Sequence, residues 1–180
     1  MSRIAIPTRD AAPAATHSTL DAIHAQLGVV PNMYRLVALS PAALAGLTSL
    51  GGALSKALDV KTRERLAIAT AQVNGCDYCL SAHTYLGKHA AKLDEVEMAA
   101  NREGGSTDAR ADAAVRFAVT VVRERGHVGD ADVQAVQAAG YSDGEVVEIV
   151  LHVALNTLTN YVNNVARTAI DFPVVNHRAK

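Results

Sequence analysis

Apolar residues recur every three or four positions along most of the chain, and no convincing run alternates between apolar and polar residues. This spacing places apolar side chains on one face of an α-helix, whereas strands alternate with a period of two. Residues that favour helix starts and ends divide the pattern into segments. We therefore predict an all-α fold, a compact bundle of about eight helices in one domain over residues 1–180.

Capping residues set the expected boundaries of these helices. A capping box at Ser18 opens a short helix that stops at Gly28, and Asn32 caps another that reaches about residue 39. Ser40-Pro41 is a favoured N-cap and N1 pair. A second capping box, Ser142-Asp143-Gly144-Glu145, starts the last long helix. The longer expected helices cover residues 41–58, 60–73, 76–91, 108–125 and 142–168, with shorter helices between residues 94 and 139.

Composition and charge narrow the functions open to such a bundle. Lys plus Arg, at 17, nearly equal Asp plus Glu, at 18, and no basic run or basic-aromatic stripe is present. We therefore expect no nucleic-acid or membrane partner. The opening residues lack the apolar stretch of a signal peptide, and no segment reaches the roughly 18 apolar residues of a membrane span. A cytoplasmic location is the default expectation.

Cys76 and Cys79 are the only cysteines in the sequence, and they follow Asn74-Gly75 directly. Residues i and i+3 lie on one side of a helical turn, so the two sulfurs can meet and cycle between dithiol and disulfide. A helix start at this point favours a thiolate, because its unpaired N–H groups and macrodipole stabilise negative charge. In a reducing compartment the spacing indicates chemistry rather than a structural disulfide.

His83 and Glu64 supply the residue types that activate a thiol. At a rise of ~1.5 Å per residue, His83 lies about 6 Å along a helix from Cys79 and about 10.5 Å from Cys76. Cys79 is therefore the thiol that His83 can deprotonate. Glu64 belongs to the preceding predicted helix, and antiparallel packing would bring its carboxylate to the imidazole, orienting the ring and raising its basicity. Nucleophile, base and orienting acid form a general catalytic arrangement.

Each of these side chains also has a purely structural interpretation. The cysteines can be two buried neighbours, His83 a hydrogen-bonded histidine on a half-buried face, and Glu64 a solvated or ion-paired carboxylate. His152, four residues after Glu148 on an apolar helix, can reach a pocket, but a hydrogen-bonded core histidine is the more frequent case. The other histidines have the surroundings of surface or loop residues: His17, His24, His89, His127 and His177.

Other cysteine chemistry fits the sequence less well. A structural zinc site needs a fourth protein ligand beside Cys76, Cys79 and His83, and neither a second CxxC pair nor a closely spaced His pair supplies one. Covalent haem attachment needs His directly after the second cysteine, where this chain has Leu80. A thioredoxin fold needs strand-helix-strand patterning, which is absent. We therefore expect neither a metal nor a cofactor.

The spacing of Glu64, Cys76-Asp77-Tyr78-Cys79 and His83 resembles the core signature of the alkylhydroperoxidase D-like branch of the carboxymuconolactone decarboxylase superfamily. Residues 30–35 and 156–173 resemble the longer members that are called peroxidase-related, so the likeness covers most of the chain. The decarboxylase branch lacks the cysteine pair, which favours the redox branch. The resemblance implies a helical domain that assembles as a trimer or hexamer, with its redox core at about residues 59–91.

The resemblance also implies a role for each motif residue. Cys79 would attack a peroxide, Cys76 would resolve the sulfenic acid and donate a proton, and His83 with Glu64 would relay protons. The best-studied type in the family has a histidine immediately before the second cysteine, where this chain has Tyr78. A tyrosine there can still donate a hydrogen bond.

Three functions are open on this basis. The leading prediction is an antioxidant, thiol-dependent peroxidase that reduces hydroperoxides through the Cys76–Cys79 dithiol and disulfide. Its expected partners are a hydroperoxide and a dithiol reductant, for which the resemblance suggests a lipoyl-type molecule. The second interpretation is a general thiol-disulfide oxidoreductase. The third is a non-enzymatic redox-sensing scaffold whose assembly changes when the cysteine pair is oxidised.

Overall fold

The computed structural model describes residues 2–178, and within them nine α-helices and one 3-10 turn, Ala14–Thr16, make up the regular secondary structure. The all-α prediction is confirmed, with one helix more than the expected eight. The helices are α1 (His17–Leu27), α2 (Asn32–Val37), α3 (Pro41–Leu54), α4 (Val60–Val73), α5 (Asp77–His89), α6 (Glu95–Arg102), α7 (Ala109–Arg123), α8 (Asp130–Ala138) and α9 (Asp143–Ala166).

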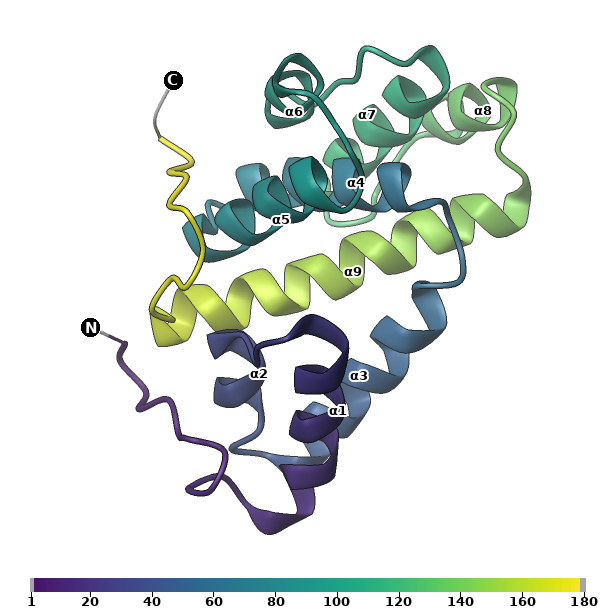
Figure 1. The fold of residues 1–180 in the computed structure, drawn as a ribbon. Helices are drawn as coiled ribbons and strands as arrows, with labels where there is room; N and C mark the ends of the chain where they lie inside the picture. Colours follow the sequence, from purple (N-terminus) through teal and green to yellow (C-terminus); the bar gives the residue numbers. More distant parts are fainter. Residues whose placement is uncertain (1, 179–180) are drawn as a thin grey trace.

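α4 is the central helix of the bundle. Its residues 66–71 are all buried, and it packs against α5, α6, α7 and α9. Figure 1 shows α9, the longest helix, crossing the molecule between the group formed by α4 to α8 and the smaller group formed by α1, α2 and α3. The faces of α4, α5 and α9 therefore meet in the middle of the structure, beside the N-terminal helices.

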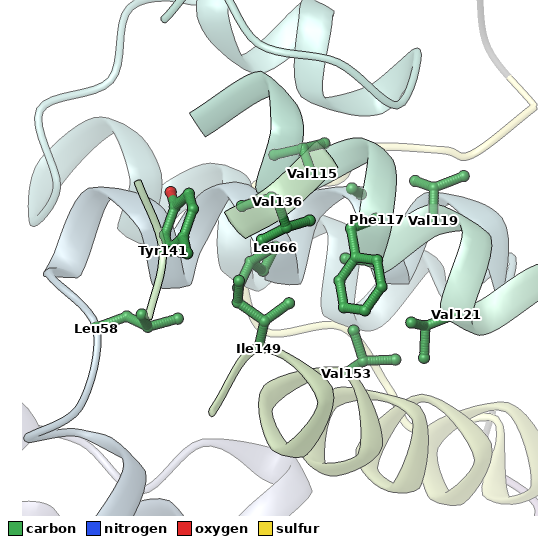
Figure 2. Packing of buried hydrophobic residues seen from close by; sticks show 13 residues of the cluster. Leu58, Leu66, Val115, Phe117, Val119, Val121, Val136, Tyr141, Ile149 and Val153 are labelled. Carbon is green, nitrogen blue, oxygen red and sulfur yellow. The ribbon is translucent and has the colours of Figure 1, made fainter. Parts of the chain in front are cut away.

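Buried apolar residues form separate clusters on the two sides of α4. The larger cluster joins α4, α7, α8 and α9 through side chains such as Leu66, Phe117, Val136 and Ile149, which Figure 2 shows packed together. A second cluster contains Ile68, Leu80, Leu93 and Met98 together with both cysteines. The cysteine pair is therefore embedded in the apolar core, where each buried apolar side chain contributes about 1.5–3 kcal/mol.

Several helix starts follow the predicted caps. Asp59 accepts hydrogen bonds from the backbone N–H groups of Lys61 and Thr62, so α4 has the predicted bounds. Ser40 accepts from Ala43 N at the start of α3. Ser142 and Glu145 form the predicted capping box of α9. Caps of this kind satisfy N–H groups that a helix start leaves without partners.

Three boundary predictions are wrong. Ser18 does not cap α1, because the 3-10 turn runs directly into that helix and makes His17 its first residue. Asn32 lies inside α2, and its amide donates to Ala169 O instead of capping. The helix expected over residues 41–58 ends at Leu54, since the chain must turn there to place Leu58 in the larger apolar cluster.

The C-terminal segment after α9 returns across α5. Phe172 packs on Tyr78 with ring centroids 5.9 Å apart, and Val175 N donates to Ser81 Oγ at 2.9 Å. His177 donates from Nδ1 to Asp77 Oδ1 at 2.7 Å. The segment therefore holds the first two turns of α5 in place.

Candidate active site around Cys79

The cysteines lie where α4 passes into α5. Asn74 ends α4, and Gly75 turns the chain with a φ of 61°, a left-handed conformation that glycine adopts without strain. Cys76 is the N-cap of α5, and its Sγ accepts a hydrogen bond from Cys79 N at 3.3 Å. The predicted position of the pair at a helix start is therefore what the structure shows, and it favours a thiolate there.

Both cysteines are free thiols and both are buried, with exposed fractions of 0% for Cys76 and 3% for Cys79. A hydrogen bond from the Cys76 thiol lowers the pKa of Cys79 to about 6, although burial opposes this, and His83, Asn163 and Asn160 lower it further. The same hydrogen bond, and then burial, raise the pKa of Cys76. The pair therefore holds one proton on Cys76 while Cys79 carries the negative charge.

The imidazole of His83 is bound to a carboxylate from the neighbouring helix. Nδ1 of His83 donates to Glu64 Oε2 at 2.8 Å, because α4 and α5 pack against each other as the sequence predicted. Burial lowers the pKa of His83, but the charge and hydrogen bond of Glu64 outweigh it and the net pKa is raised. Glu64 thus fixes the ring and leaves Nε2 as the nitrogen available to a reacting group.

Two asparagines of α9 complete the surroundings of the Cys79 sulfur. Asn163 Nδ2 donates to Cys79 Sγ at 3.3 Å, and the neighbouring amide of Asn160 lowers the pKa of that thiol further, although its Nδ2 has no hydrogen-bond partner within residues 2–178. Asn74 Nδ2 donates to Asn160 Oδ1 at 2.9 Å, which orients the Asn160 amide. The sequence analysis gave these asparagines no role. Their signal was a repeat of polar residues every three or four positions on an otherwise apolar helix face.

The side chain of Tyr78 contacts α2 and the C-terminal segment instead of the Cys79 sulfur. Its hydroxyl accepts a hydrogen bond from Met33 N at 3.1 Å, and its ring packs edge-on against Phe172 at an interplanar angle of 87°. Burial raises the pKa of Tyr78, so the hydroxyl stays protonated. Tyr78 therefore joins α5 to α2 and to the C-terminal segment.

A cavity of about 700 Å³ lies beside Cys79, between α1 to α3 and the α4, α5 and α9 core. Cys79, His83 and Glu64 line it, whereas Cys76 does not. His152 is buried, as the core interpretation predicted, but it also lines this cavity, and its Nε2 has no partner in the described part of the chain. Much of the remaining wall is apolar: Ile23, Leu27, Val29, Met33, Leu47, Leu86, Leu155 and Phe172.

The structure also bears on a metal site and on a membrane-spanning helix. Among residues 2–178, no three His, Cys, Asp or Glu side chains are grouped so that they could hold a metal ion. In the same range, no helix has the length and apolar content that crossing a membrane requires.

Comparison with known proteins agrees with the fold and the motif. Residues 41–124, which contain all four predicted site residues, match the model of the carboxymuconolactone decarboxylase family. No curated protein matches the chain. A peroxidase-related protein from Ralstonia eutropha JMP134, described as an alkylhydroperoxidase AhpD core, is 23% identical with a TM-score of 0.84, covering 94% of this chain and 92% of that chain.

Two further solved structures have the same architecture. A peroxidase-related protein from Silicibacter sp. TM1040 is 22% identical with a TM-score of 0.81, covering 93% of this chain and 91% of its own. The debrominase Bmp8 is 18% identical with a TM-score of 0.76, covering 94% and 91%. At these identities the likeness is one of fold. Residues 41–124 of this chain are thus similar to the carboxymuconolactone decarboxylase family, and its fold is that of the alkylhydroperoxidase-like, peroxidase-related structures.

Proposed function

We propose that the protein is a thiol-dependent peroxidase that reduces hydroperoxides through Cys79 and Cys76. The observation that carries this proposal is the contrast between the two thiols. Cys79 lines the cavity and has a pKa of about 6, whereas Cys76 does not line it and holds the shared proton. A low-pKa thiol at a cavity wall with a second thiol next to it suits attack on a small oxidant followed by disulfide formation.

In the first step the Cys79 thiolate, whose proton His83 has already taken, attacks the terminal oxygen of the hydroperoxide. The O–O bond breaks, Cys79 becomes a sulfenic acid, and the leaving alkoxide takes a proton from the His83 imidazolium to give an alcohol. Glu64 stabilises the imidazolium through the 2.8 Å hydrogen bond to Nδ1. The amides of Asn160 and Asn163 stabilise negative charge on the Cys79 sulfur before the attack.

In the second step Cys76 attacks the sulfenic sulfur of Cys79. An S–S bond forms, the S–O bond breaks, and the hydroxide leaves as water with the proton of Cys76. An external dithiol then reduces the disulfide, becomes a disulfide itself and returns both protons. Because Cys79 is 3% exposed and Cys76 is not exposed, a small dithiol that enters the cavity, such as a lipoyl-type molecule, is a better reductant here than a folded protein.

Single-turnover kinetics test the proposal. The reduced protein is mixed with one equivalent of cumene hydroperoxide, and thiols are counted over time beside the variants Cys79→Ser and His83→Ala. We expect rapid loss of two thiols in the parent protein, no loss in Cys79→Ser, and slow loss in His83→Ala. A parent protein that reacts no faster than a free model thiol would refute the peroxidase and direct attention to disulfide exchange.

A cytoplasmic location and an assembly of several copies belong to the same proposal. Residues 149–166 of α9 contain no charged side chain, and an exposed apolar stripe runs along that helix through Val147, Leu151, Leu158, Tyr161 and Val165. A continuous exposed apolar stripe of this kind usually marks a surface that another protein covers. We propose a second copy of this chain as the partner, because its own α9 offers a matching uncharged face. Light scattering of the parent protein and of Leu158→Lys measures the number of copies in the assembly.

A further inference from the structure

His152 is a buried polar side chain that the proposed reaction does not use. It lies on α9 with 5% of its surface exposed, and it lines the cavity that Cys79 and His83 also line. Its Nε2 has no hydrogen-bond partner within residues 2–178. Leaving a buried polar atom without a partner costs about 1–3 kcal/mol, so such an atom calls for an explanation.

The surroundings of His152 define what its free nitrogen can bind. Burial lowers the pKa of His152, and Arg63 lowers it further, while the Leu54 carbonyl and Glu64 oppose the shift without cancelling it. The ring is therefore neutral at neutral pH and has one N–H donor and one acceptor nitrogen. The Leu54 carbonyl accepts from the ring. Nε2, which has no partner, is then the acceptor nitrogen. A ligand group with an O–H or N–H could donate a hydrogen bond to it.

The position of His152 along α9 places it away from the sulfur. Residues 152, 156, 159, 160 and 163 are all buried polar positions on one face of that helix. Asn160 and Asn163, which act on Cys79, lie about 12 and 17 Å from His152 along the helix axis at ~1.5 Å per residue. Between them, Asn156 donates to His152 O and Thr159 donates to Asn156 O, so both side chains bond to their own helix.

The cavity is larger and more apolar than hydrogen peroxide needs. Its volume of about 700 Å³ falls in the range that holds small organic ligands, and apolar side chains of α1 and α3 form part of the wall. A ligand that fills it would contact Cys79 at one end and pass His152 farther along α9. The pattern is an apolar site with polar groups at two separated points.

We propose that the cavity binds an elongated apolar substrate that has its reacting group at Cys79 and a distal hydroxyl or N–H that donates a hydrogen bond to Nε2 of His152. Because Nε2 is itself buried, this bond requires the ring to turn toward the ligand. This inference rests on the proposed function for the reacting group, and it names the substrate class as hydroperoxides with an apolar body and a distal donor. His152 is then a specificity residue of the site.

Binding of a matched pair of unreactive probes tests the inference without peroxide chemistry. Isothermal titration calorimetry compares 1-decanol with 1,10-decanediol on the reduced protein, on His152→Leu, and on His152→Gln, whose amide oxygen can replace Nε2 as the acceptor. We expect the parent protein to prefer the diol by about fivefold to tenfold, the yield of one added hydrogen bond. His152→Leu should lose this preference and His152→Gln should keep part of it.

Exposed His127 in the loop after α7 does not line the cavity, so His127→Leu is the matched control and should keep the parent preference. Circular dichroism and thermal unfolding establish whether each variant is folded. If His152→Leu does not fold, His152→Asn takes its place, because its shorter amide does not reach the Nε2 position. Equal binding of both probes by the parent, or a diol preference that survives in the folded variant without the acceptor, would overturn the inference.

A second arm separates this inference from the proposed function. Single-turnover rates are compared for decyl hydroperoxide and 10-hydroxydecyl hydroperoxide. Reaction with both at equal rates, together with equal probe binding, would refute the distal donor and leave the peroxidase in place. Failure to react with either, together with a diol preference that depends on His152, would refute the peroxidase and leave the binding site.

Discussion

Two carboxylates of the fold, the buried Glu97 and the half-buried Glu64, have different surroundings and therefore different expected roles. Glu97, 3% exposed, binds Arg65 Nε at 2.7 Å and accepts hydrogen bonds from Asn101, Ser106 and Thr107. Burial would raise the pKa of Glu97, but these hydrogen bonds lower it to about 2. Its oxygens have a full set of partners, and it does not line the large cavity.

Glu64 has a sparser environment. The structure gives its carboxylate one side-chain partner, His83, and places both residues in the cavity wall. A carboxylate that is fully bound by fixed donors stabilises the fold, because removing it leaves those donors buried and unpaired. A carboxylate with a single titratable partner beside a cavity can instead hold or release a proton during a reaction. We therefore propose that Glu97 stabilises the fold and that Glu64 takes part in the reaction, and the predictions test that division.

The largest effect is expected for Glu97→Gln. The substitution leaves Arg65, whose side chain is only 12% exposed, without its counter-charge, so the free energy of unfolding should fall by about 3–5 kcal/mol. Urea denaturation measures it. Exposed Glu95, two positions earlier at the start of α6, supplies the control, since Glu95→Gln should change stability by less than about 0.5 kcal/mol. Equal effects of the two substitutions would contradict a structural role for Glu97.

Acid unfolding sharpens the same prediction. The pKa of Glu97 is lowered from 4.5 to about 2, so the native state binds the proton more weakly than the unfolded state does. The stabilisation from its charge is therefore complete above pH 4.5 and is lost as the pH falls toward 2. In Glu97→Gln this part of the pH dependence should disappear. A variant with the same acid transition as the parent would show that other groups cause it.

Glu64→Gln should act on rate instead. Losing the carboxylate removes the support for the His83 imidazolium, and we expect the rate of thiol loss with cumene hydroperoxide to fall about 100-fold, within the range for general acid-base groups. The free energy of unfolding should change far less than in Glu97→Gln. Single-turnover kinetics and urea denaturation on the same samples measure both. A variant that is strongly destabilised but reacts at the parent rate would reverse the assignment.

Asn163→Ala should produce the smallest of the three effects. The amide lowers the pKa of Cys79, which is about 6 in the parent, so the rate of alkylation by iodoacetamide should rise with pH through about 6 and then level off. Without the amide this inflection should move to higher pH. Asn164, exposed on the same helix, donates to Asn74 O, and Asn164→Ala is the control for losing an α9 asparagine. An unshifted inflection would remove Asn163 from the site.

Sequence reasoning predicted features that depend on neighbouring residues. The bounds of α4, the box that starts α9 and the helix start at Cys76 all follow from caps within a few residues. The prediction that Ser18 caps the first helix was wrong because a preceding 3-10 turn runs directly into that helix. The Glu64 and His83 contact was predictable because only one turn of chain joins the two helices.

The rest of the site depends on contacts between distant segments. Asn163 reaches Cys79 across 84 positions of sequence, and the cavity wall combines α1, α2 and α3 with α9. The partnerless Nε2 of His152 results from packing around the whole ring, which periodicity does not describe. The spacing of polar residues along α9 does not indicate which of them meet the sulfur, and only the packed structure shows it.

The hydrogen bond from Cys79 N to Cys76 Sγ makes the backbone itself a reporter of the redox state. When the two sulfurs join, the electron density and position of that acceptor change, and the amide of Cys79 experiences the change directly. The chain contains no tryptophan, so intrinsic fluorescence offers only tyrosine. The Cys79 amide resonance in an NMR spectrum therefore gives a label-free signal with which oxidation and reduction of the pair can be followed residue by residue.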